Sequence, residues 1–152
     1  MPLALSSYSV VLSLHIMAVV AAFGLPLAYP LLLPYVRRAH PEALAGVHDA
    51  QHRMNRLLTA PGTLLILLFG AYMASKEDLW GEVWVIVPFV ILIAIGGIGG
   101  ALVVPSTKRL SELAPAGGAA YDAEYRRYLR LEVLLGVLVL VAIFFMAAKP
   151  FA

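Results

Sequence analysis

One long run of sequence, from Met1 to Val36, contains no Asp, Glu, Lys or Arg, and this feature most constrains what the chain can fold into. A bilayer core of roughly 30 Å is crossed by about 20 apolar residues of helix. The run therefore predicts a first membrane span. Apart from tyrosines, its only titratable side chain is His15. Polar side chains in hydrocarbon are costly and tend to face the interior of a bundle, so His15 is a candidate for any chemistry in this span.

Composition places the whole chain in a membrane. Of 152 residues, 62% are hydrophobic and 13% are charged, whereas soluble domains are about one-quarter charged. The absence of cysteine excludes disulfides, thiolate metal sites and iron–sulfur clusters. Nucleic-acid binding requires a basic face on a soluble domain. Because the basic residues here flank apolar runs, we expect no nucleic-acid partner.

Four apolar runs predict an all-α, four-helix membrane bundle that forms a single domain over residues 1–152. The expected spans are about 7–34, 57–75, 83–105 and 130–148. Pro26, Pro30 and Pro34 lie in the first run, and each proline removes a hydrogen-bond donor and crowds the preceding turn. We therefore expect the inner half of this span to depart from regular helix, with a kink near Gly24.

The basic residues are unevenly distributed between the two sides of this bundle. Nine of the 11 fall in the two long loops, and two fall on the other side. Cytoplasmic loops carry an excess of Lys and Arg, so residues 36–56 and 106–130 are expected in the cytoplasm, with both termini and residues 76–82 outside. This pattern predicts a multi-pass protein of the inner (plasma) membrane. The nine are Arg37, Arg38, Arg53, Arg56, Lys108, Arg109, Arg126, Arg127 and Arg130; the two are Lys76 and Lys149.

The first basic loop contains His48 and His52 four residues apart. This spacing puts both imidazoles on one helix face and suits a divalent metal. No general-base glutamate lies beside the first histidine, so we expect a solvated histidine face. The two histidines belong to an amphipathic helical segment that begins at Glu42, runs into the second span and is expected to lie along the membrane surface. No metal site is predicted.

The third span carries small residues at helical spacing. Gly96 pairs with Gly100, and Gly97 pairs with Ala101. Such pairs allow another helix to approach closely. A flat cofactor against the face of Gly96 and Gly100 needs the same absence of side chains, so both interpretations remain open.

The last span has a carboxylate at its start. The uncharged segment from Val133 to Ala148 reaches only about 24 Å at the helical rise, so the span must include the preceding turn with Glu132. A carboxylate at the edge of the hydrocarbon is costly unless it is paired. We predict a structural ion pair between Glu132 and Arg56.

Several short motifs resemble a family of bacterial predicted integral membrane proteins of unknown function. This resemblance covers essentially the whole chain and rests on Leu14-His15, Pro61-Gly62, Trp84, Pro105 and the terminal Met146-Ala147-Ala148-Lys149-Pro150. That family is similar in turn to the copper-resistance CopD-like proteins and to the HemJ-type protoporphyrinogen oxidases. In the latter, a histidine of the first helix is implicated in heme binding, and His15 matches it.

The chain departs from both relatives at their functional positions. HemJ-type proteins carry lysine and histidine on the third helix, but the third span here has neither, so protoporphyrinogen oxidation is not expected. CopD-like proteins would bring metal ligands to the outer side. Here that side offers only Lys76, Glu77, Asp78, Glu82 and Lys149.

Two main functional hypotheses follow. In the first, the chain is a noncatalytic accessory or structural subunit of a larger membrane complex, in contact with other membrane subunits or with itself, and His15 is structural. In the second, His15 is an axial ligand to heme b or another tetrapyrrole beside the face of Gly96 and Gly100. Metal handling or transport is a further alternative. No catalytic residues are predicted.

Overall fold

The computed structural model describes residues 6–151, and its regular structure there is entirely helical. Four long helical rods, each apolar enough to cross a membrane, run Ser7–Ala39, Pro41–Lys76, Val83–Leu113 and Gly118–Ala148. They span 33, 36, 31 and 31 residues, well above the roughly 20 that a bilayer requires. The predicted four-helix membrane architecture is confirmed.

The first and last rods are the single helices α1 (Ser7–Ala39) and α6 (Gly118–Ala148). Each middle rod contains a wider π-helical segment. The second comprises a 3₁₀ turn η1 (Pro41–Ala43), α2 (Leu44–Met54), the π segment η2 (Asn55–Thr59) and α3 (Ala60–Lys76). The third comprises α4 (Val83–Ile98), the π segment η3 (Gly99–Val103) and α5 (Val104–Leu113).

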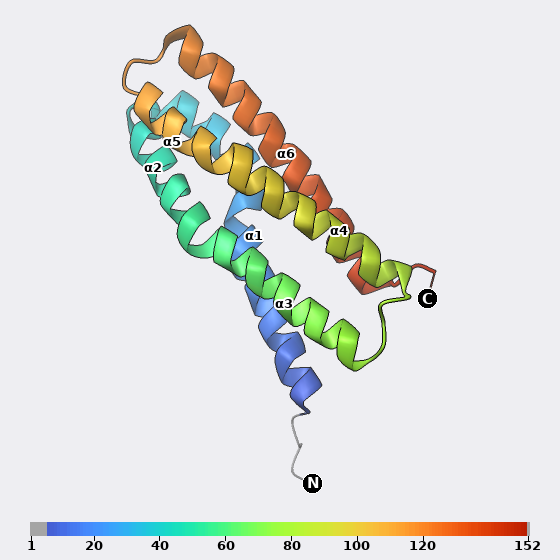
Figure 1. The fold of residues 1–152 in the computed structure, drawn as a ribbon. Coiled ribbons are helices and arrows are strands. Elements are labelled where there is room, and N and C mark those ends of the chain that lie inside the picture. Colours follow the sequence, from blue (N-terminus) through green and yellow to red (C-terminus); the bar gives the residue numbers. More distant parts are fainter. Residues whose placement is uncertain (1–5, 152) are drawn as a thin grey trace.

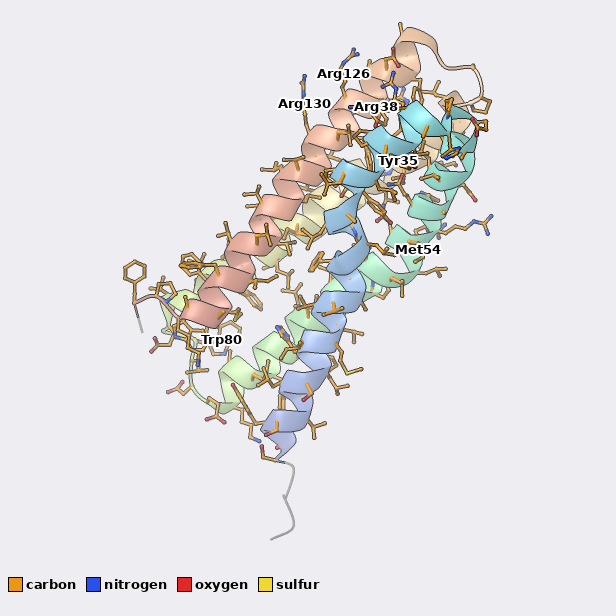
Figure 2. All side chains as sticks on the ribbon, turned by 180° about the vertical axis from the view of Figure 1, so that it is seen from behind. Tyr35, Arg38, Met54, Trp80, Arg126 and Arg130 are labelled. Atoms are coloured by element: carbon orange, nitrogen blue, oxygen red, sulfur yellow. The ribbon has the colours of Figure 1, made fainter. Side chains whose placement is uncertain are left out.

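The rods run up and down, so that chain ends and loops separate into two groups. The start of α1 and the end of α6 lie toward the same end of the molecule as the α3–α4 connection, and the α5–α6 connection lies at the opposite end (Figure 1). Arg38, Arg126 and Arg130 gather at that opposite end, far from Trp80 (Figure 2). We call it the basic end.

α1 is a continuous helix through Pro26, Pro30 and Pro34. The expected interruption of the helix in its inner half is therefore wrong, whereas the kink near Gly24 stays a prediction. Pro26 has no N–H to donate to the carbonyl of Ala22, four residues earlier. That carbonyl instead accepts a hydrogen bond of 3.2 Å from the Thr59 hydroxyl. A neighbouring helix thus supplies a donor in place of the one that the proline removes.

α1 and α3 approach closely at the same level. A Cβ added to Gly62 would lie 2.8 Å from the Cβ of Ala22 and 3.7 Å from the carbonyl oxygen of Ala18. Small residues on both helices permit this contact, as in other membrane helix pairs. The core continues through Phe23, Ile66, Leu92, Ile95 and Val139 at mid-height.

α2 runs into the second span, as expected, but it packs within the bundle. It continues into α3 through η2, packs against α5, and buries Leu44, His48 and Gln51. A second core lies here, at the basic end, and is rich in tyrosine. It contains Tyr29, Leu33, Leu44, Val103, Leu110, Tyr121, Tyr125 and Tyr128.

Candidate functional site

The four rods line a cavity of about 240 Å³. All of them contribute to its wall, which is mostly apolar. We call it the central cavity. Its apolar lining includes Phe23, Pro26 and Leu27 of α1, Leu64 and Leu67 of α3, Ile95 and Val103 of the third rod, and Leu135 and Val139 of α6.

Four polar side chains form one part of this wall, namely Asn55, Thr59, Thr63 and Glu132. Two of them use their donors within the protein, because the Thr59 hydroxyl donates to Ala22 and the Thr63 hydroxyl donates to the carbonyl of Thr59 at 2.7 Å. Asn55 differs. It is 4% exposed, and its amide nitrogen Nδ2 is buried with no hydrogen-bond partner. Buried polar groups are nearly always hydrogen-bonded, so this donor calls for an explanation.

Glycines form another part of the wall. Gly96, Gly99, Gly100 and Gly136 all line the cavity. A Cβ added to Gly100 would meet no atom within 4 Å, whereas one added to Gly96 would lie 3.8 Å from the Thr63 methyl. The two glycines singled out in the sequence therefore do lie at one site. At Gly100 the glycine leaves open space, which packing against a helix does not explain.

Both π segments border the cavity at matching positions in their rods. Asn55 begins η2 six residues before Pro61, and Gly99 begins η3 six residues before Pro105. After each segment, a backbone N–H donates to the carbonyl five residues earlier. Ala60 donates to the carbonyl of Asn55, and Val104 donates to the carbonyl of Gly99. A π-helical turn widens the helix and is frequent at functional sites. Here the two turns bring Asn55 and Gly100 to the cavity wall.

The cavity is open toward the side between α3 and α4. Among its lining residues, Ala60 and Leu64 of α3 and Gly96 and Gly100 of the third rod are exposed. α3 packs mainly against α1, and α4 packs mainly against α6. The contact between α3 and α4 is less extensive than either of these. In a bilayer this side faces lipid, so the cavity is accessible from the hydrocarbon.

His15 does not belong to this site. Phe23 is the first residue of α1 that lines the cavity, and His15 lies eight residues, or about 12 Å of helix, before it. A Cβ added to Gly70 of α3 would lie 3.4 Å from the His15 ring. The imidazole thus packs against α3, and its Nδ1 is buried without a partner. The structure does not bring His15 together with Gly96 and Gly100.

Glu132 lines the cavity and is 4% exposed. The only ion pairs among residues 6–151 involve other groups, so Glu132 and Arg56 are not brought within salt-bridge distance. Arg56 lies in η2, where the helix surface is rotated by the π turn. The neighbouring polar groups of Glu132 are instead Tyr128, one turn earlier on α6, and Tyr29 of α1.

His48 is fully buried, contrary to the expected solvated face. Gln51 donates through Nε2 to the Tyr128 hydroxyl at 3.0 Å, so its Oε1 is an acceptor, and His48 Nδ1 donates to it at 2.8 Å. The Tyr121 hydroxyl then donates to His48 Nε2 at 3.0 Å. Because both ring nitrogens are engaged, His48 has no lone pair free for a metal.

The imidazole of His48 lies beside the tyrosine-rich core at the basic end, outside the charge-free segments of the rods. Burial lowers the pKa of His48 below its usual 6.5 and raises the pKa of Tyr121 to about 12. His52 takes a different partner, the carbonyl of Val104 at 3.2 Å. No cluster of three or more potential metal ligands occurs among the residues that the structure describes.

Comparison with known proteins identifies the chain at the level of a family. A family model described as predicted integral membrane protein (DUF2269) matches residues 9–150. The chain belongs to this family. The family-level resemblance found in the sequence is therefore confirmed, whereas its relation to the CopD-like and HemJ-type proteins is not shown. No curated protein and no solved structure matches the DUF2269 chain.

The residue that sequence reasoning missed at the central cavity is Asn55. It belongs to a polar stretch, His52-Arg53-Met54-Asn55-Arg56, in which nothing distinguishes it as buried. One available signal was its position six residues before Pro61, which Gly99 repeats before Pro105.

Proposed function

We propose that this DUF2269 protein is a noncatalytic membrane protein that binds a small lipid-soluble molecule in its central cavity. The observation that carries this proposal is the unpartnered Asn55 amide in the wall of a cavity lined by all four rods. Ligand sites are typically concave and apolar, with a few convergent polar groups. The central cavity has this character.

Its size suits a small molecule. An engineered cavity of about 150 Å³ holds benzene, and the central cavity, at about 240 Å³, is larger by more than half. By that ratio it accommodates roughly ten non-hydrogen atoms. The opening between α3 and α4 allows the remainder of a longer molecule to extend into lipid.

The residues of the wall argue for binding rather than catalysis. Within the described part of the chain, Glu132 is the one ionisable side chain that lines the cavity. General acid–base catalysis commonly uses two groups with separated pKa values. We therefore propose an accessory role, in which the protein holds or delivers its ligand beside other membrane proteins.

A tetrapyrrole is a poorer fit to the same site. Among residues 6–151, no imidazole and no thioether lines the cavity, and these are common protein ligands of heme iron. His15 packs against Gly70 instead. We assign no role through heme.

The distribution of charge supports the orientation. The basic end would face the cytoplasm, and both termini would lie outside, in the plasma membrane. The cavity would then open within the bilayer at mid-depth, where a molecule dissolved in the hydrocarbon can reach it.

Photolabelling by an apolar phenyl diazirine in nanodiscs tests the proposed function. The probe labels lipid-facing side chains as well, so labelled peptides are compared between variants. We expect labelling at the inward-facing Leu135 and Val139 in the unaltered protein and its loss in Gly100→Leu, which fills open space. Gly97→Leu is the control, since Gly97 does not line the cavity and a Cβ there meets nothing within 4 Å. Equal inward labelling of all three proteins would overturn the proposal.

A further inference from the structure

We propose that the ligand of the central cavity is an uncharged molecule with a carbonyl oxygen, held by hydrogen bonds from Asn55 and Glu132. This inference rests on the proposed function and specifies its ligand. The apolar body of the molecule lies against the glycine wall, and it enters between α3 and α4.

Asn55 supplies the first donor. Its Nδ2 carries N–H groups and can only donate. The nitrogen is buried and has no hydrogen-bond partner among residues 6–151. Leaving such a donor unsatisfied costs free energy, which an acceptor on the ligand recovers. The missing partner is therefore an acceptor such as a carbonyl oxygen.

Glu132 supplies the second donor. Its carboxyl group is buried, and no Lys or Arg side chain among residues 6–151 forms an ion pair with it. Ionised carboxylates are very costly to bury without a partner, and such groups become neutral instead. A neutral carboxylic acid has one O–H donor. It can donate to the same ligand oxygen as Asn55.

The remaining polar side chains of the wall cannot compete for that oxygen. Thr59 and Thr63 each have a single hydroxyl hydrogen, and both hydrogens are donated to backbone carbonyls. The wall therefore offers two free donors and no free cation. Because the wall has donors but no cationic side chain to attract an anion, it favours a neutral acceptor. Because the carboxylic acid of Glu132 is neutral, the wall does not attract a lipophilic cation.

The position of the two donors fixes how the molecule lies. Asn55 is at the end of η2 nearer to α2, and Glu132 is one turn beyond Tyr128 on α6. Both are thus at the part of the cavity nearer the basic end. Gly96 and Leu67 line the cavity further toward the opposite end. The carbonyl points toward the basic end and the apolar body toward the middle of the membrane.

Benzophenone provides a direct probe, because its carbonyl is both the acceptor and the photoreactive group. In nanodiscs, irradiation should attach it to peptides that contain Thr59 or Leu135. Unreactive competitors then test the recognition. Fluorenone has the carbonyl and fluorene is the matching hydrocarbon, so fluorenone should compete roughly fivefold or more better, the effect of about one net hydrogen bond.

Variants separate this inference from the proposed function. Asn55→Leu should reduce benzophenone labelling roughly fivefold, and Glu132→Gln, which keeps an N–H donor, should bind better than Glu132→Leu. Gly97→Leu should label as the unaltered protein does. If Gly100→Leu loses labelling while fluorene and fluorenone compete equally, the cavity is a binding site but does not recognise a carbonyl group. That result would overturn this inference and leave the proposed function standing.

Two other outcomes are decisive. If tetraphenylphosphonium displaces benzophenone better than fluorenone does, Glu132 binds as a charged carboxylate and the inference is wrong. If neither benzophenone nor the apolar diazirine labels the inward-facing residues of the unaltered protein, the proposed function itself fails. The competition experiments require no variant, so an Asn55 variant that did not fold would not prevent the test.

Discussion

The close contact between α1 and α3 at Gly62 predicts a large effect from a very small substitution, Gly62→Ala. The new Cβ would lie 2.8 Å from the Cβ of Ala22. Carbon atoms in favourable contact are about 3.5–4.0 Å apart, so the two helices would have to separate locally by roughly 0.7–1.2 Å. Both atoms belong to short, rigid side chains. The strain cannot be relieved by rotation, and overpacking of this kind costs about 1–3 kcal/mol.

Reversible unfolding by sodium dodecyl sulfate in mixed micelles measures this cost. The matched control is Gly97→Ala, because a Cβ at Gly97 meets no atom within 4 Å. Gly62→Ala should be less stable than both the control and the unaltered protein. Adding Ala22→Gly removes the opposing methyl and should restore most of the loss. Equal stability of the two single glycine variants, or no restoration in the double variant, would refute the described α1–α3 contact.

Three further predictions concern other parts of the molecule. Asn55→Leu should stabilise the ligand-free protein in detergent by about 1–3 kcal/mol, because it removes a buried unsatisfied donor; a loss of stability would show that the amide has a protein partner. Since burial lowers the pKa of His48, its contribution to stability should be complete above pH 6.5 and should decline as the pH falls toward the lowered value; a His48→Gln variant with an unchanged pH profile of thermal unfolding would contradict this. Cysteines introduced singly at positions 46 and 79 should differ in whole cells, with position 79 alone labelled by an impermeant maleimide, whereas equal labelling would refute the orientation.

Much of the fold could be predicted because membrane spans depend on one strong signal. A charge-free run long enough to cross the bilayer has few alternatives to a helix. The same argument placed Glu132 inside the last rod, where α6 indeed continues without interruption. The helical segment that runs from Glu42 into the second span was predicted, but it was placed along the membrane surface, because the polar sequence of α2 resembles that of a surface helix.

Two predictions were wrong because a hydrogen bond from another part of the fold satisfies a polar group that the local sequence leaves without a partner. Three prolines in α1 predict a departure from regular helix, but the Thr59 hydroxyl donates to the carbonyl that Pro26 leaves free. His48 was expected in solvent, but Gln51 and Tyr121 satisfy both of its ring nitrogens. These partners come from other turns or from a rod 73 residues away, and helical periodicity alone does not indicate them.

The candidate site was only partly predictable for a related reason. Gly96 and Gly100 drew attention through their spacing, and both line the central cavity. Asn55 reaches the same cavity because the π turn of η2 changes the phase of the helix. A prediction that assumes 3.6 residues per turn does not detect such a change. His15 had the strongest chemical signal, yet it packs elsewhere, against Gly70.

The proposal that the central cavity binds a lipid-soluble molecule is tested most directly by native mass spectrometry of the protein released from membranes in mild detergent. The unaltered protein should carry a small molecule of defined mass that collisional activation removes. Gly97→Leu should carry the same molecule, and Gly100→Leu, whose side chain occupies the cavity, should lack it. A bound molecule that persists at equal occupancy in Gly100→Leu, or a complete absence of bound molecules from the unaltered protein together with no uptake of added benzophenone, would contradict the account.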